Sequence, residues 1–338
     1  MSAKAMPKAS AAEVEAIEKD HFKAVAHDVL RDWRLYVLLL PMMFFLLCWK
    51  YFPIASMISS FKYMPTTDSS FGGGSFTALW NGLDNFRYLF AQPDFWAAFR
   101  NTFVLSFYGL VFGFPFPIIL ALFFNEIRLK AVRSVAQVFS YLPKFISVVV
   151  MTNLIGMLLK SSNPQTGVVA GIIGGLFENI GVFDLTSNPG AFRSIYIISD
   201  IWEGAGYGSI VYFAAILGIS PTSYEAARID GASKMQQLLY VTIPGMAGTL
   251  VIMLILRIGN LLSVGYEKVY LLQQLGKAGS TWSTSQTVST YVINVVMSSS
   301  SVHKGIGSAA DLFNSLLSMF LVLGSNSIAR KMSNTSLF

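Results

Sequence analysis

Residues 220–244 read SPTSYEAARIDGASKMQQLLYVTIP, a polar hairpin that separates two long apolar segments. Ser220 and Pro221 are typical of the N-cap and first turn of a new short helix. Gly231 permits a tight turn after that helix. Pro244 falls early in the next apolar segment, where neighbouring helices can accommodate a kink. The hairpin therefore predicts a helix, a turn and a second helix that leads into a membrane span.

Six segments are long and apolar enough to cross a membrane as helices, which takes roughly 20 residues each. They are residues 35–60, 96–124, 135–159, 192–219, 238–264 and 308–328. A shorter Gly-rich stretch at 168–177 predicts an interfacial or re-entrant helix. The expected fold class is an all-α integral membrane protein, with a six-helix transmembrane domain over residues 35–331.

The composition agrees with this fold class. Of the 338 residues, 54% are hydrophobic and only 12% are charged, whereas soluble domains carry about 25% charge. The net charge of +6 does not indicate nucleic-acid binding, because the cations are scattered between apolar spans. The one cysteine, Cys48, excludes an internal disulfide, and three widely separated histidines show no metal-ligand spacing.

Basic residues indicate which side of the membrane each loop faces, because cytoplasmic loops carry an excess of Lys and Arg. The clearest signals are the inner hairpin at 126–134 and the Arg330–Lys331 pair after the last span. With six spans, they predict that the N- and C-termini are both cytoplasmic. The outer loops, rich in Gly, Ser, Thr and Asn, are then residues 61–95, 160–191 and 265–307.

The first 34 residues do not form a secretory signal, because mostly polar sequence precedes the first apolar segment. A set of residues recurs there at steps of three and four: Val14, Ile17, His21, Val25 and Val29. This spacing predicts an amphipathic helix on the membrane surface over part of residues 1–34, with a frayed cytosolic tail as the alternative. Residues 332–338 are expected to form a short C-terminal tail.

The hairpin resembles the EAA loop of permease subunits of binding-protein-dependent ABC importers. That loop reads E-A-A, three residues, G, nine residues, and then apolar-x-apolar-P. The matching positions here are Glu225, Ala226, Ala227, Gly231, Val241, Ile243 and Pro244. The similarity extends along nearly the whole chain, and oligosaccharide permeases have comparable sequences at residues 32–41, 99–102, 141–147, 199–204 and 335–338.

The resemblance implies a type I ABC importer permease fold in a bacterial cell membrane. Two permease subunits form the channel, two cytoplasmic ATPases power it, and an extracytoplasmic binding protein delivers an oligosaccharide. Because this chain has one EAA loop, a second permease subunit is expected, giving a heterodimer. The loop would dock on an ATPase as a coupling helix, through Glu225, Ala226, Ala227, Asp230, Gly231 and Pro244.

The sequence predicts no catalytic site of its own. It has no G-x-x-x-x-G-K-[ST] motif for nucleotide phosphates, and no nucleophile–base constellation stands out. ATP and magnesium are therefore expected on the partner ATPase, and no cofactor or metal is expected on this chain.

Ionisable side chains within spans are costly, so they are candidate functional residues. Asp200 and Arg257 predict an intramembrane charge pair, for which a structural lock is the favoured interpretation. Glu203 and Tyr207 share a helix face and predict a sugar pathway, although a structural Glu203 is the alternative. The resemblance adds Asn260 and Ser263 to the candidate pathway.

Two other functions remain open on the sequence. The same kind of permease could import a non-sugar solute, such as an amino acid, phosphate or peptide. A secondary transporter or channel would need internal repeats or a filter, and it would leave the EAA loop unexplained. The long hydroxyl-rich outer loops favour a sugar.

Overall fold

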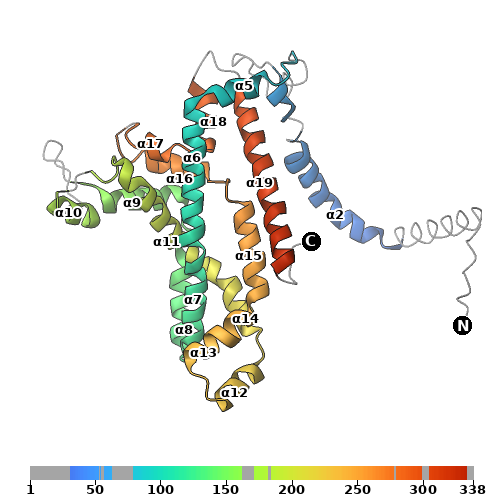
Figure 1. Ribbon diagram of the computed structural model, residues 1–338, viewed down its shortest axis with the longest axis vertical. Helices are drawn as coiled ribbons and strands as arrows, with labels where there is room; N and C mark the ends of the chain where they lie inside the picture. Colours follow the sequence, from blue (N-terminus) through green and yellow to red (C-terminus); the bar gives the residue numbers. More distant parts are fainter. Residues whose placement is uncertain are drawn as a thin grey trace, which may run out of the picture. The chain divides into compact units, whose positions relative to one another are not determined.

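The computed structural model (Figure 1) divides the chain into two units, residues 1–58 and 59–338, and each is described by itself. The residues described are 31–52, 54, 57–62, 79–161, 171–181, 184–277, 279–298 and 304–332. The amphipathic helix predicted near the N-terminus and all but the first residue of the predicted tail at 332–338 therefore lie outside the described residues.

The first unit contains one long helix. The α-helix α2 (Trp33–Leu46) continues into the π-helical turn η1 (Leu47–Tyr51), and together they are apolar enough to span a membrane. Among the described residues the candidate span runs over Trp33–Tyr51, whereas the sequence predicted a span over 35–60. Residues 53, 55 and 56 of that prediction lie outside the described residues. The short 3-10 helix η2 (Met57–Phe61) comes next.

The second unit is helical, and among the described residues it has no strand, only one isolated bridge between Lys62 and Trp80. Its first half comprises α5 (Asp84–Ala91), α6 (Pro93–Tyr108), η3 (Gly109–Gly113), α7 (Pro115–Glu126), α8 (Lys130–Tyr141), η4 (Leu142–Phe145), α9 (Val148–Leu159) and α10 (Ile172–Asn179). Its second half comprises α11 (Pro189–Leu217), α12 (Pro221–Ile229), α13 (Lys234–Gln237), η5 (Leu238–Thr242), α14 (Ile243–Gly245), α15 (Ala247–Gly259), α16 (Tyr266–Gln273), α17 (Trp282–Ser285), α18 (Val288–Ser298) and α19 (Lys304–Met332).

Three helices in the described part of the chain are long and apolar enough to cross a membrane: Trp33–Tyr51, Pro93–Glu126 and Gly305–Lys331. Three bent helix pairs also qualify, with bends of 101° between Lys130–Phe145 and Val148–Leu159, 68° between Pro189–Leu217 and Pro221–Ile229, and 63° between Lys234–Gly245 and Ala247–Gly259. The number of candidate spans is therefore three, or up to six if each bent pair counts as one.

The third predicted span, 135–159, is not a continuous helix. Pro143 lies in the 3-10 turn η4, and the backbone of Ile146 and Ser147 is extended before α9 begins. Proline lacks the N–H that an α-helix needs, so α8 gives way to a 3-10 turn at Pro143 before the chain becomes extended. The sequence alone placed a single span where the structure has two helices at a sharp angle.

Packing in the second unit joins helices that are distant in sequence. The long helix α11 lies along α7 and contacts α8, while α19 packs against α15 and α18. Gly206 allows the close approach of α11 to α8, because a Cβ there would collide with the carbonyl oxygen of Ser140. Figure 1 shows α12 at one end of this unit and α5 and α18 at the other.

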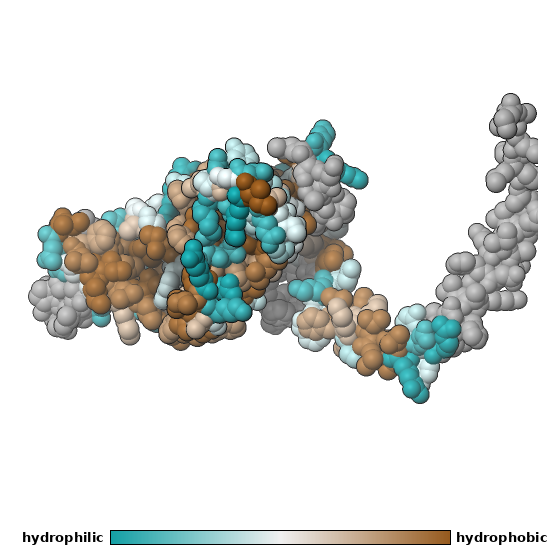
Figure 2. All heavy atoms as spheres, turned by 90° about the horizontal axis from the view of Figure 1, so that it is seen from below, coloured by the Kyte–Doolittle hydropathy of each residue, from teal (hydrophilic) through white to brown (hydrophobic). Residues whose placement is uncertain are grey.

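The flanks of the second unit carry many exposed apolar side chains. Phe123, Phe139 and Met157 are 66%, 71% and 72% exposed. Figure 2, seen from the end that carries α12, shows hydrophilic residues gathered over that end and hydrophobic residues on the flanks. An apolar flank of this kind suits contact with lipid or with another membrane subunit rather than with water.

Candidate functional site

The 220–244 hairpin folds as a helix, a turn and a second helix. The helix α12 starts at Pro221 with Ser220 as N-cap, as predicted. It ends in a Schellman motif, in which the N–H of Ala232 donates to the Ala227 carbonyl at 2.8 Å. Gly231 occupies the left-handed position of this motif with φ of +77°. The turn therefore depends on the residue that the sequence identified for it.

Two sets of polar contacts hold the hairpin together, and a third ties it to α7. The hydroxyls of Tyr224 and Thr242 lie 3.0 Å apart and join α12 to η5. A capping box formed by Ser233 and Gln236 starts α13. The Nζ of Lys234 lies 3.1 Å from Oε2 of Glu126 at the end of α7. The hairpin is thus attached to two different spans, so a movement of α12 can be transmitted to both.

The chain bends next to Pro244. The turn before it, η5, is π-helical, and the helix axis changes by 63° between Lys234–Gly245 and Ala247–Gly259. The π-helical turn accommodates a proline because it rearranges the hydrogen bonds that the missing N–H would disrupt.

The outer surface of α12 lies open. Glu225, Ala226 and Asp230 are exposed, and Ala227 is half-buried. Ile229 is 86% exposed, a large value for an aliphatic side chain that sequence analysis did not single out. A cavity of about 770 Å³ lies beside the helix, with Glu225 and other residues of the hairpin in its wall. A small, partly apolar surface of this kind is suited to a protein partner.

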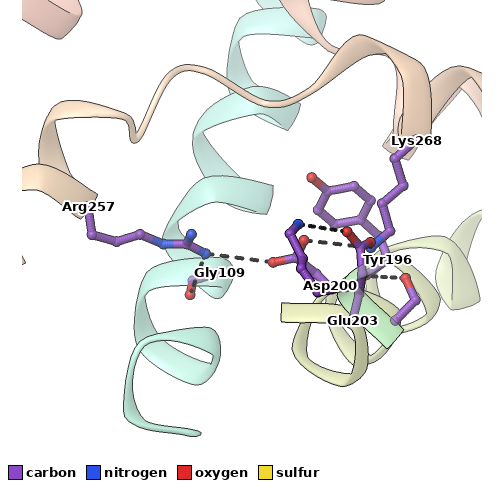
Figure 3. Close-up of polar contacts among 8 residues, drawn as sticks. Gly109, Tyr196, Asp200, Glu203, Arg257 and Lys268 are labelled. Carbon is purple, nitrogen blue, oxygen red and sulfur yellow. Dashed lines mark hydrogen bonds and ion pairs between the residues drawn. The ribbon is translucent and has the colours of Figure 1, made fainter. Parts of the chain in front are cut away.

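A second site lies inside the bundle and consists of five charged side chains, termed here the ion network: Lys144, Asp200, Glu203, Arg257 and Lys268. Figure 3 labels the last four of them. Each oxygen of the Glu203 carboxylate accepts a hydrogen bond from a lysine, at 2.9 Å from Lys144 and at 3.0 Å from Lys268. Glu203 and Lys268 are both 8% exposed. This pairing compensates for burying the charges, since charge-assisted hydrogen bonds are the stronger kind.

Asp200 lies between Lys268 and Arg257 and contacts both. Its Oδ1 lies 3.6 Å from Nζ of Lys268, and its Oδ2 lies 3.7 Å from Nη2 of Arg257. The same Arg257 nitrogen donates to the carbonyl of Gly109 at 3.4 Å. The Asp200–Arg257 pair that the sequence proposed is therefore one part of a larger set of contacts.

The guanidinium of Arg257 fits against two glycines. A Cβ at Gly109 would lie 3.4 Å from Nη2, and a Cβ at Gly113 would lie 3.5 Å from it. These glycines are four residues apart on the π-helical turn η3, so they form one smooth surface for the arginine.

A cavity of about 280 Å³ opens beside this pair and is termed here the Arg257 cavity. Asp200, Arg257 and Asn260 lie in its wall, together with parts of α7, α11 and α15. The amide of Asn260 donates to the Leu256 carbonyl at 3.1 Å. The structure thus brings three of the residues chosen from the sequence to one cavity.

The other residues chosen from the sequence lie elsewhere. Tyr207 is 49% exposed and packs edge-on against Phe145, with ring centroids 6.2 Å apart. Ser263 is exposed in the turn after α15. Neither belongs to the wall of the Arg257 cavity. Glu203 and Tyr207 share a helix face, but only Glu203 is covered.

Sequence analysis did not select the two lysines of the ion network as site residues. Lys268 falls in the predicted solvated loop at 265–307, yet it is buried on α16, with the ring of Tyr196 5.6 Å from its Nζ. The apolar Leu272 lies four residues after Lys268, on the same helix face, and the structure buries both. The position of Lys144 directly after Pro143 predicts a local helix break that could expose it to a cavity, but a role at the end of a span is favoured over a functional one.

Three comparisons relate this chain to known proteins. The family described as binding-protein-dependent transport system inner membrane component matches residues 113–330, which include the hairpin and the ion network. Protein LplB of Bacillus subtilis is 33% identical over 91% of this chain and 92% of LplB. YteP of Bacillus subtilis, a polygalacturonan/rhamnogalacturonan transport system permease protein, is 30% identical over 98% of both chains.

A solved structure agrees in fold over almost the same range. It is a chain of a bacterial ABC transporter involved in the import of the acidic polysaccharide alginate. The two chains are 34% identical, with a TM-score of 0.78, over 92% of this chain and 99% of the other. The same transporter was solved in complex with an alginate pentasaccharide-bound periplasmic protein.

Proposed function

The chain belongs to the family of binding-protein-dependent transport system inner membrane components, and we propose that it is the permease subunit of an ATP-driven oligosaccharide importer. The relatives named for transport of sugar polymers cover nearly the full chain, which supports a saccharide over other solutes. ATP is hydrolysed on a separate partner chain in this proposal, and an extracytoplasmic binding protein delivers the sugar.

The observation that carries the proposal is the geometry of the 220–244 hairpin. It presents an open helix, α12, and is tied to α7 by Lys234 and to η5 by Tyr224. If a cytoplasmic ATPase binds α12, closure of that ATPase would move α7 and the span that follows η5. Glu225, Ala226, Ala227, Asp230, Gly231 and Pro244 form the coupling site in this proposal.

We propose six spans with both termini in the cytoplasm of a bacterial cell. This arrangement takes each bent helix pair as one crossing and places α12 on the cytoplasmic side. The basic residues around 126–134 and at Arg330 and Lys331 support it, because positive charge is retained on that side.

A second permease subunit completes the channel in this proposal. Asp311 supports it, because this carboxylate is exposed on α19 and has no ion-pair partner among the described residues. Its position is within the candidate span Gly305–Lys331, where an unpaired charge facing lipid would be costly. A neighbouring subunit or a water-filled pathway would remove that cost, and lipid alone would not.

The sugar pathway is proposed to run along the exposed polar residues of α11 and α15. Asp200, Arg257 and Asn260 form one wall at the Arg257 cavity, and Tyr207 and Ser263 offer further contacts. Glu203 has both oxygens bound to lysines, so its part in the pathway is to hold Lys144 and Lys268 in place.

The test is reconstitution of this chain with its second permease subunit, ATPases and binding protein in vesicles. Sugar-loaded binding protein should stimulate both ATP hydrolysis and uptake of labelled oligosaccharide. Glu225→Lys should abolish the stimulation while leaving the complex assembled, and Glu267→Lys, an exposed site on α16, is the matched control. Uptake of another solute class in place of sugars, or normal coupling by Glu225→Lys, would contradict the proposal.

A further inference from the structure

We infer that the Arg257 cavity binds a carboxylate of the transported sugar, so that the substrate is an acidic oligosaccharide. This inference rests on the proposed function and adds the substrate class and the residue that selects it. Arg257 is the specificity residue, and the other members of the ion network position it.

The charges of the ion network do not balance. Lys144, Lys268 and Arg257 are cationic, and within the described part of the chain two carboxylates, Asp200 and Glu203, pair with them. One positive charge therefore remains inside a helical bundle whose flanks are apolar. An unbalanced charge in a membrane interior is expensive, and such charges mark ligand or ion pathways. A transient anion from the substrate would balance it.

The contact distances assign the excess charge to Arg257. The lysines are each within hydrogen-bond distance of Glu203, at 2.9 and 3.0 Å. Arg257 approaches the Asp200 carboxylate only to 3.7 Å, and among the described residues its guanidinium donates a hydrogen bond only to the carbonyl of Gly109. A guanidinium has five N–H donors, so most of them are free to bind a ligand.

The position of Arg257 makes those donors accessible. Its side chain is 45% exposed, whereas that of Lys268 is 10% exposed. It borders a cavity of about 280 Å³, and its Nη2 packs against Gly109 and Gly113. Asn260 in the same wall adds amide groups for hydroxyls.

The chemistry of this wall fits a uronate residue. A planar guanidinium binds a carboxylate through two parallel hydrogen bonds, and a lysine does not match this geometry. The negative charge of Asp200 beside Arg257 would repel additional substrate carboxylates. Only one carboxylate of the sugar would therefore bind Arg257 at a time. A neutral sugar would satisfy hydroxyl contacts and leave the charge unbalanced.

The experiment compares two ligands that differ only in the carboxylate. The full complex, with both permease subunits and the ATPases, is purified in detergent without binding protein. Binding of trigalacturonate is measured against the same trisaccharide with each carboxyl reduced to the alcohol. Trigalacturonate should bind at least about tenfold more tightly, as expected for a charged hydrogen-bonded pair, and added salt should reduce the difference.

Variants separate the role of Arg257 from general stability. Arg257→Gln should abolish the preference for trigalacturonate, and Arg257→Lys should keep part of it. Arg87→Gln, at an exposed arginine that pairs only with neighbouring Asp84 in the described contacts, should retain the preference. Complex yield and melting temperature are recorded for each variant. If the Arg257→Gln variant does not assemble, the comparison uses the Arg257→Lys variant.

Equal binding of the two trisaccharides would overturn the inference and would indicate that a carboxylate of the second permease subunit balances Arg257. A preference that survives in Arg257→Gln would overturn it as well. In both cases uptake of neutral oligosaccharides by the reconstituted vesicles would leave the proposed function intact. Failure of all saccharide uptake would instead refute the proposed function.

Discussion

The Nζ of Lys268 lies 3.0 Å from Oε2 of Glu203, although the two residues are 65 positions apart in the chain. This contact joins α16 to α11, and Lys144 joins η4 to the same carboxylate. The break in the third span and the long fourth helix are therefore connected through one side chain. Displacement of any of these elements would leave a buried charge without its partner.

Lys268→Met should destabilise the protein strongly. It leaves Glu203 and Asp200 with one fewer cation in a buried setting, and breaking a buried pair costs about 3–5 kcal/mol. Complex yield and melting temperature should both fall. Lys277→Met, which removes an exposed lysine, is the matched control. Equal melting of the two variants would contradict a structural role for Lys268.

Glu203 and Tyr207 should respond differently to substitution. The sequence favoured a direct sugar contact for both, but the Glu203 oxygens are occupied by lysines. Glu203→Ala should therefore lower the yield of assembled complex, and Glu203→Gln should do so less. Tyr207→Ala should keep the yield and slow sugar uptake, since its ring is exposed. Normal yield with slowed uptake for Glu203→Ala would restore the direct contact.

Gly231 should control coupling through its backbone conformation. Its φ of +77° is unfavourable for residues with a Cβ, at about 1–2 kcal/mol, and is inaccessible to proline. Gly231→Pro should abolish transport-linked ATP hydrolysis, Gly231→Ala should reduce it, and Gly231→Asn should retain most of it, because asparagine tolerates this conformation. The measurement is sugar-stimulated ATPase activity at equal expression. Full activity of Gly231→Pro would remove the turn from the coupling mechanism.

Cysteine labelling tests the proposed topology. Cys48 is first replaced by serine, and single cysteines are introduced at Asn179 and Arg128, which are both exposed. A membrane-impermeant reagent added outside should label residue 179 and spare residue 128. Ser285 is unsuitable for this purpose because it is fully buried. External labelling at 128 would reverse the orientation.

The loop around Asp184 should lose stability at acid pH. Burial tends to raise the pKa of its carboxyl, but hydrogen bonds from Ser187 and Thr186 lower this pKa below its usual value. A lowered pKa in the folded state stabilises the loop above the unfolded pKa, and this stability is lost as pH falls through the folded pKa. Amide exchange at Ser187, corrected for intrinsic rates, should therefore accelerate at acid pH. Asp184→Asn, which tolerates the same backbone φ of 52°, should remove most of that pH dependence.

The sequence determined the features that depend on neighbouring residues. Apolar segments of sufficient length located the helices of the membrane domain, because the hydrocarbon interior forces backbone groups to pair within each segment. The hairpin was equally readable, since Ser220, Pro221 and Gly231 each act on the backbone within a turn of their own position.

The tertiary structure decided which charges meet. Lys144 and Lys268 reach Glu203 across 59 and 65 positions, and no local pattern specifies such a pairing. It follows from the angle at which the third span breaks and from the packing of α16 against α9, in a hydrophobic cluster that also includes Phe192 of α11. The same packing leaves the Arg257 side chain 45% exposed in the wall of a cavity, 3.7 Å from Asp200.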